Sequence, residues 1–233
     1  KGKLTEFAAG ILGVPPESLR IQGSGEVTDG KSARISFGDI YADALRSEKK
    51  IDSYYYYNPP ETHKLRDSAD HEPGVDIGQY DIHYAYCFAT QAAIVEVDES
   101  TGEVTVLKII AAQDAGRSIH HQSVEGQIEG AVLMGVGYAL YEEFRQKDGF
   151  IVTDNLSKLK VPSILKAPDI QPIVIEREQS TGPFGAKGMG EVPVNPAAPA
   201  IINAIYDAVG VRITELPATR EKILEALKIH RRG

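Results

Sequence analysis

The stretch Gly182-Pro183-Phe184-Gly185-Ala186-Lys187-Gly188-Met189-Gly190-Glu191-Val192-Pro193 is the most informative pattern in the chain. Four glycines lie within nine residues, and a carboxylate, Glu191, follows at once. Glycine lets the backbone adopt positive φ and pass close to a ligand, and a carboxylate fixed by such a loop can serve as a general base. On spacing alone, a glutamate stabilised by the dipole of a following helix is the more frequent case. The lack of Gly-Lys-Ser/Thr argues against a nucleotide-binding P-loop.

Six shorter segments accompany this loop, and their order matters more than any one of them. They are YCFA (86–89), AIVEVD (93–98), TGEV (101–104), DAGRSI (114–119), EGQIEG (125–130) and LPAT (216–219). Together with the loop, which has the form GxKGxGE-P, they resemble the xanthine oxidase family of molybdenum hydroxylases. That family also includes bacterial aldehyde oxidoreductases and nicotinate dehydrogenases. The resemblance covers nearly the whole chain, most strongly from about Tyr84 onward, and it is to the C-terminal portion of the family's molybdopterin-binding part.

The resemblance implies roles for particular residues. Glu191 falls on the family's catalytic base beside molybdenum. Cofactor contacts are implied for seven residues: Gln122, Ser123, Gln127, Lys187, Gly188, Met189 and Gly190. For residues 121–123, phosphate binding at a helix N-terminus and ordinary helix capping are about equally expected. No residue of the chain is expected to ligate a metal directly.

The resemblance also implies an activity and partners. A molybdenum hydroxylase would oxidise a small molecule, either an N-heterocycle of the purine or nicotinate type or an aldehyde, with oxygen derived from water. The cofactor would be molybdenum-molybdopterin, with a cytosine dinucleotide form favoured by a split, bacterial architecture. Partner chains would supply the upstream molybdopterin-binding part, the iron–sulfur clusters and FAD, so a hetero-oligomer is expected. The alternative is a non-catalytic truncated or scaffold fragment that folds but binds no cofactor alone.

Composition narrows the class of protein. The 233 residues carry a formal net charge of −8 and show no basic stripe, which argues against nucleic-acid binding. No apolar run is long enough for a membrane span, and no apolar signal segment follows residue 4, so a cytoplasmic protein is expected. The single cysteine, Cys87, cannot form an internal disulfide or a Cys-rich iron–sulfur site.

Patterning predicts an α+β fold, because helices and strands are mixed without strict alternation. Helices are expected at 5–12, 40–45, 122–141, from Asn195 as N-cap onward, and 219–230; strands are expected at 18–21, 23–31, 51–57, 84–97, 104–113, 149–153 and 172–178. Residues 61–79 are polar and read as a long loop. The whole chain, 1–233, is expected to form one portion of a molybdopterin-binding domain, with two sub-lobes at about 1–80 plus 195–233 and at 81–194.

Three further features have plain interpretations. His120 and His121 are adjacent and would diverge, so a surface or capping role is favoured over metal binding. The four tyrosines at 54–57 suggest packing in a core or a subunit interface. Cys87 is expected to be a small buried side chain.

Overall fold

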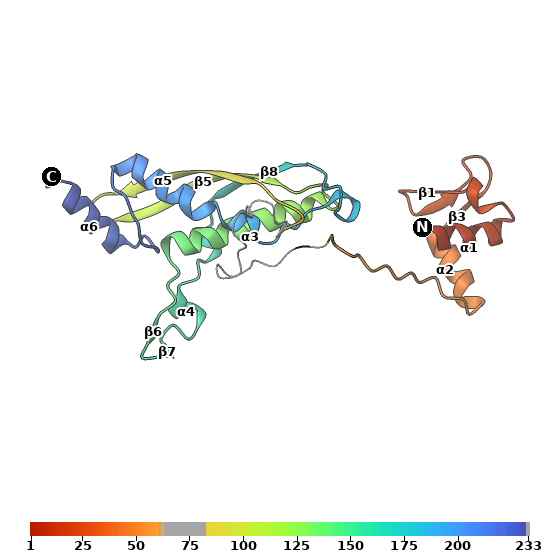
Figure 1. Ribbon diagram of the computed structural model, residues 1–233, viewed down its shortest axis with the longest axis horizontal. Coiled ribbons are helices and arrows are strands. Elements are labelled where there is room, and N and C mark those ends of the chain that lie inside the picture. The colour runs from red at the N-terminus through yellow and green to blue at the C-terminus, as the bar shows by residue number, and fades with distance from the viewer. Residues whose placement is uncertain (61, 63–82, 232–233) are drawn as a thin grey trace, which may run out of the picture. The chain divides into compact units, whose positions relative to one another are not determined.

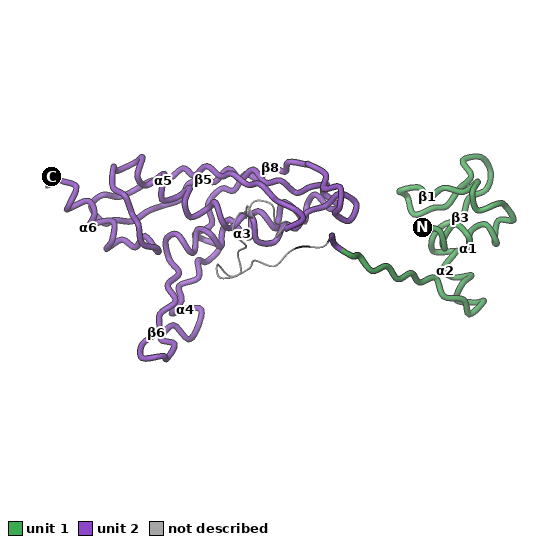
Figure 2. Tube along the Cα trace, in the orientation of Figure 1, with its two compact units in different colours: residues 1–58 green, residues 59–233 purple. Residues whose placement is uncertain are grey.

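The computed structural model describes residues 1–60, 62 and 83–231, and the expected loop at 61–79 lies largely outside them. The chain separates into two compact units, Lys1–Asn58 and Pro59–Gly233 (Figure 2). Residues 195–231 therefore belong with the segment that precedes them, which differs from the expected grouping with residues 1–80. The physical reason is the apolar packing of the last helices described below.

The smaller unit combines two helices with a short antiparallel sheet. Its elements are α1 (Gly2–Leu12), η1 (Pro16–Ser18), β1 (Arg20–Gln22), β2 (Glu26–Thr28), β3 (Arg34–Ser36) and α2 (Phe37–Arg46). Ala8, Val27 and Ile40 form the centre of its core. Ser36 caps α2, since its hydroxyl oxygen accepts a hydrogen bond from the Asp39 amide at 3.0 Å.

The strand predicted at 51–57 is wrong. Residues 51–58 run without regular secondary structure, and Tyr54, Tyr55 and Tyr56 are all exposed. A strand needs a neighbour for its backbone hydrogen bonds, and no described strand pairs with this run. The β-forming composition of four tyrosines is therefore not enough to make a strand here. Nor do these three side chains pack in a core.

The larger unit is built on a three-stranded sheet in the order β4 (Ala89–Asp98), β5 (Glu103–Asp114), β8 (Asp169–Ile175). The β4–β5 pair is antiparallel, with a register shift between Ile94 and Val95, and β8 runs parallel to β5. The long helix α3 (His121–Leu140) lies between β5 and β8 in sequence, so the three form a β–α–β crossover. Figure 1 shows α3 beneath this sheet, and α5 (Ala197–Val209) packs chiefly against β4.

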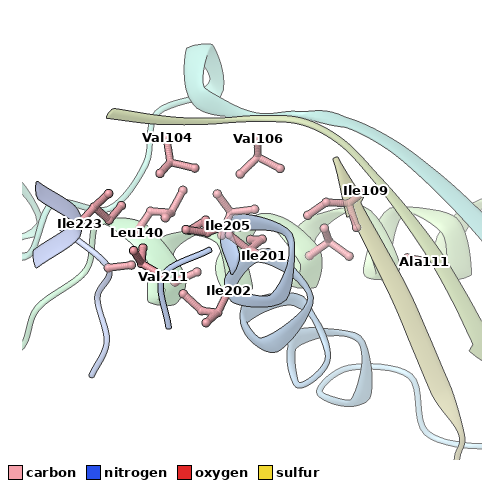
Figure 3. Packing of buried hydrophobic residues seen from close by; sticks show 14 of the residues in the cluster. Val104, Val106, Ile109, Ala111, Leu140, Ile201, Ile202, Ile205, Val211 and Ile223 are labelled. Atoms are coloured by element: carbon pink, nitrogen blue, oxygen red, sulfur yellow. The ribbon is translucent and has the colours of Figure 1, made fainter. Parts of the chain in front are cut away.

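The core of this unit forms where the sheet meets α3, α5 and α6 (Arg220–His230). Val104, Val106 and Ile109 of β5 face Ile201 and Ile205 of α5 (Figure 3). Each of these side chains is nearly or wholly removed from water, which stabilises the fold by about 1.5–3 kcal/mol per large aliphatic side chain. This packing ties the C-terminal helices to the sheet and explains the division into units.

The helix α3 buries one broad face against the core. In α3 the buried set is Ile128, Ala131, Val132, Gly135, Val136, Gly137, Ala139 and Leu140. Gly135 brings α3 close to α5, because a Cβ built there would lie 2.4 Å from the Ala197 Cβ. The predicted Asn195 cap is wrong: Pro196 is the N-cap of α5, without a side-chain hydrogen bond, and Asn195 ends the preceding turn.

The remaining elements are short. They are β6 (Gln146–Lys147), β7 (Phe150–Ile151), α4 (Leu156–Leu159), η4 (Ile164–Lys166), η5 (Pro183–Gly185) and η6 (Val192–Val194). The β6–β7 hairpin and α4 project away from the sheet (Figure 1). The mixture of helices and sheets confirms the expected combination of α and β structure. Within the described ranges, no helix has the length and apolar character needed to cross a membrane.

Candidate active site

The glycine-rich loop lies against the end of β5. Its backbone is held by three hydrogen bonds: the Lys187 amide donates to the Ala115 carbonyl at 3.1 Å, and the Arg117 and Gln179 amides donate to the Gly185 carbonyl at 2.7 and 3.0 Å. Gly116 allows this approach, because it has φ +64° and a Cβ built on it would lie 2.5 Å from the Gly185 carbonyl oxygen. The segment 114–119 and the loop 182–193, both noted in the sequence, therefore meet in space.

Lys187 and Asp114 form an ion pair in the interior. The Lys187 Nζ lies 2.5 Å from Asp114 Oδ2, and their side chains are only 8% and 6% exposed. The same ammonium donates to the Tyr86 carbonyl at 2.9 Å. The Lys187 ammonium is thus paired within the protein, and its side chain is not exposed on the loop surface.

Glu191 lies at the opposite end of the loop and is exposed. It precedes the 3-10 turn η6, whose Val194 amide donates to the Glu191 carbonyl at 3.2 Å. Its side chain lines a cavity of about 490 Å³. The other residues that contribute to this cavity include Tyr84, Cys87, Gly188 and Gly190. The structure therefore gives the loop carboxylate a concave space in which a ligand can contact it.

Two of the other expected cofactor residues, Gly188 and Gly190, line this cavity, and a third, Gln127, lies beside Gly190. Gly188 is exposed, and a Cβ built on it would meet nothing within 4 Å. A Cβ built on Gly190 would lie 3.9 Å from Oε1 of Gln127, so the amide of α3 lies beside the loop. Met189 differs, because its side chain is half-buried and packs against the hydrophobic core.

The start of α3 is capped by a histidine. Nδ1 of His120 accepts the Ser123 amide at 3.1 Å and lies 2.8 Å from the Ser123 hydroxyl. The capping role expected for this pair is thus confirmed for His120. Nε2 of His121 lies 3.5 Å from Oε1 of Glu125, one turn further along α3. Ser123 is occupied by the cap, while Gln122 is exposed in the first turn.

Cys87 has a different place from the one expected. It is half-buried at the cavity wall, and its thiol donates to the Gly188 carbonyl at 3.6 Å. Burial raises the pKa of the Cys87 thiol above its ordinary value, and nearby Lys187 partly opposes this. Sequence reasoning treated Cys87 as inert and gave no role to Tyr84. Cys87 and Tyr84 both lie just before β4, in the segment where the family resemblance begins. This position was the signal in the sequence that could have indicated a role for them at the site.

Comparison with known proteins identifies the family. A model of the molybdopterin cofactor-binding domain matches residues 1–168. The chain belongs to this family. The membership confirms the resemblance to the xanthine oxidase family of molybdenum hydroxylases. The matched residues end before the loop that carries Glu191, so they leave the role of that residue untested.

Related proteins extend the match along the chain. A Bacillus subtilis protein, named as a probable subunit of xanthine dehydrogenase, is 40% identical over 145 residues, 62% of this chain and 20% of the relative. An Escherichia coli protein named "Probable hypoxanthine oxidase XdhD" is 32% identical over 229 residues, 97% of this chain and 22% of the relative. The structure of quinoline 2-oxidoreductase from Pseudomonas putida 86 superposes with a TM-score of 0.66, with 27% identity, 97% of this chain and 28% of that one covered. The chain thus spans between 20% and 28% of these relatives.

The residues at the cavity fit a molybdopterin cofactor. Gly188 and Gly190 present exposed backbone where no side chain obstructs a ligand. Gln127 adds a side-chain amide, which can both donate and accept hydrogen bonds. Glu191 adds an exposed carboxylate at the same cavity. The exposed backbone, the amide and the carboxylate together suit molybdopterin, which is rich in heteroatoms and would need a proton acceptor beside it.

Proposed function

We propose that the chain supplies the base-bearing portion of a molybdenum hydroxylase. The observation that carries the proposal is the Glu191 carboxylate, exposed in a cavity with Gly188 and Gly190, beside Gln127. These residues come from segments more than sixty positions apart, and the fold brings them to one surface. When bound, the molybdenum cofactor would accept the electrons and activate the oxygen for hydroxylation of a small molecule.

The residues of this chain would perform distinct tasks. The Glu191 carboxylate would accept a proton at its Oε atoms, since it is the exposed carboxylate of the cavity and is carried on a held loop. The backbone of Gly188, Met189 and Gly190 would contact the pterin at close range. The Gln127 amide would orient the cofactor by hydrogen bonding. At the start of α3, Gln122 is the freer candidate for a nucleotide tail, because Ser123 is engaged by the His120 cap.

Partners and substrate follow from the family. The share of the relatives that this chain spans supports a requirement for further molybdopterin-binding sequence. The Bacillus subtilis relative is named as a subunit, which supports a multi-chain enzyme with iron–sulfur and FAD chains. Names among the relatives refer to xanthine, hypoxanthine and aldehydes. We therefore propose a purine, another N-heterocycle or an aldehyde as substrate. A split, multi-chain architecture also favours a pterin with a cytosine nucleotide tail.

Molybdenum content tests the proposal. The chain is purified alone and again after co-expression with a chain that carries the rest of the molybdopterin-binding domain, and molybdenum is measured by elemental analysis. We expect near-stoichiometric metal only in the complex. Gly188→Leu should abolish it, because the added side chain would fill the open space over the loop. Gly23→Leu is the matched control, since its Cβ also meets nothing within 4 Å, but in the smaller unit.

The opposite result has a clear meaning. If neither preparation contains molybdenum, the cofactor assignment is wrong and the chain is better described as a non-catalytic scaffold fragment. If Gly188→Leu and Gly23→Leu retain equal amounts of metal, the complex binds the cofactor elsewhere and the loop is not its contact surface.

A further inference from the structure

We infer that the buried ion pair of Lys187 with Asp114 positions Glu191, and that Lys187 is a positioning residue rather than a cofactor ligand. This inference rests on the proposed function, because it concerns how the proposed base is held. It begins from the 2.5 Å contact between Lys187 Nζ and Asp114 Oδ2, with both side chains more than nine-tenths buried.

The pair joins three segments of chain. Lys187 belongs to the glycine-rich loop, Asp114 ends β5, and the Tyr86 carbonyl that accepts the second hydrogen bond of the ammonium lies before β4. The other carboxylate oxygen of Asp114 accepts the Gly116 amide at 2.9 Å. Both charged groups therefore have more than one hydrogen-bond partner, which is the condition under which a buried pair is tolerated. Removing either charge would leave the other buried without compensation.

A second anchor lies just beyond the base. The Gln91 side chain, which projects from β4, donates its amide N–H to the Pro193 carbonyl at 2.6 Å. The loop is thus attached to the sheet at Lys187 and again at Pro193, and Glu191 lies between these two attachments. Because only a few residues separate the anchors, the Glu191 backbone has little freedom. The exposed Glu191 residue, which lines the cavity, is therefore held at a fixed backbone position.

This arrangement predicts what the ion pair contributes. A base displaced by about 1 Å from its productive position can lose about 10²-fold in rate. The ion pair would limit such displacement without contacting substrate. Its loss should therefore lower kcat and leave KM nearly unchanged, since substrate binding does not depend on proton removal.

The test combines two measurements on four variants: Asp114→Asn, Lys187→Met, the double variant, and Glu191→Gln. Hydrogen–deuterium exchange is followed in the full chain for the loop 182–193 and for α3 as the internal reference. We expect each single variant to accelerate loop exchange on the order of 10-fold or more while α3 stays protected. The double variant should exchange more slowly than either single variant, because no lone charge remains buried. In the assembled enzyme, the singles should lose on the order of 10² in kcat at constant KM, and the double should recover part of it.

The outcomes separate this inference from the proposed function. Unchanged loop exchange and unchanged kcat in both single variants would overturn the positioning role. So would equal loss of protection in the loop and in α3, because the pair would then support the whole unit. Full activity of Glu191→Gln with a normally protected loop would instead refute the role of Glu191 as the base. The hydrogen–deuterium exchange result for the ion pair would still stand.

Discussion

The close approach of α3 and α5 at Gly135 gives a quantitative prediction. A Cβ added at this glycine would lie 2.4 Å from the Ala197 Cβ and 3.0 Å from the Val194 carbonyl oxygen. Apolar carbons in contact are normally about 3.5–4.0 Å apart, so the Gly135→Ala change requires the helices to separate by roughly 1 Å. Gly130 provides a matched control in the same helix, since its Cβ would meet nothing within 4 Å.

The magnitude follows from two opposing effects. Replacing glycine by alanine within a helix stabilises by about 1 kcal/mol, and this gain applies to both variants. Overpacking costs about 1–3 kcal/mol, and we expect the upper end because one clash is with the backbone of a second element. Gly135→Ala should therefore lose about 2 kcal/mol of unfolding free energy, and Gly130→Ala should gain up to about 1 kcal/mol.

Urea unfolding followed by circular dichroism measures both variants against the parent chain. The smaller unit contributes equally to all three curves, so the difference reports the larger unit. The difference between the two variants, about 3 kcal/mol, isolates the packing effect. If Gly135→Ala proves as stable as Gly130→Ala, α3 and α5 do not pack as closely as the structure shows, and the predicted clash between them is refuted.

Two further predictions concern titrating groups. Hydrogen bonds from the Ser100 hydroxyl and amide lower the pKa of Asp98 from 3.8 to about 2. Because the pKa is lower in the folded state, these hydrogen bonds stabilise the fold above pH 3.8, and the stabilisation is lost as the pH falls towards about 2. Thermal melts should therefore show that Asp98→Ala destabilises the protein at pH 7 and that this destabilisation shrinks as the pH falls through that range. Burial raises the pKa of Cys87, so alkylation of this single thiol by iodoacetamide should have its midpoint above 9.0, and Lys187→Met should raise it further. A midpoint below 9.0 would contradict the effect of burial on Cys87. A pH-independent effect of Asp98→Ala would contradict the hydrogen bonding of Asp98.

Local patterns predicted the regular elements of the larger unit well. The periodicity at 122–141 gave α3 within one residue at each end, because its apolar face is wide and continuous. The pair β4 and β5 followed from β-branched residues on both sides of the short connection at 98–103. By contrast, the tyrosines at 54–57 favoured a strand by composition, yet they have no partner strand among the described residues.

The sequence motifs located the candidate site, but they did not show how each of its residues is held. The motif singled out the loop that carries Glu191, and Gln127 was predicted as a further cofactor contact; in the structure Gln127 lies beside Gly190 of that loop. Lys187 and Met189 were expected to contact the cofactor, and the structure shows that the Lys187 side chain is buried and that Met189 packs against the core. That difference depends on a contact between Lys187 and Asp114, 73 residues apart. A single sequence shows that both are charged residues within motifs and does not show that they meet.

The rate of substrate oxidation in the assembled enzyme tests the central claim most directly. Glu191→Gln preserves the shape of the side chain and removes its ability to accept a proton. Glu225→Gln, on the exposed side of α6, is the control for loss of one negative charge. The account predicts a fall in kcat of about 10²–10⁴-fold for Glu191→Gln, with molybdenum content retained, and no change for Glu225→Gln. Equal rates in the two variants would show that Glu191 is not the base.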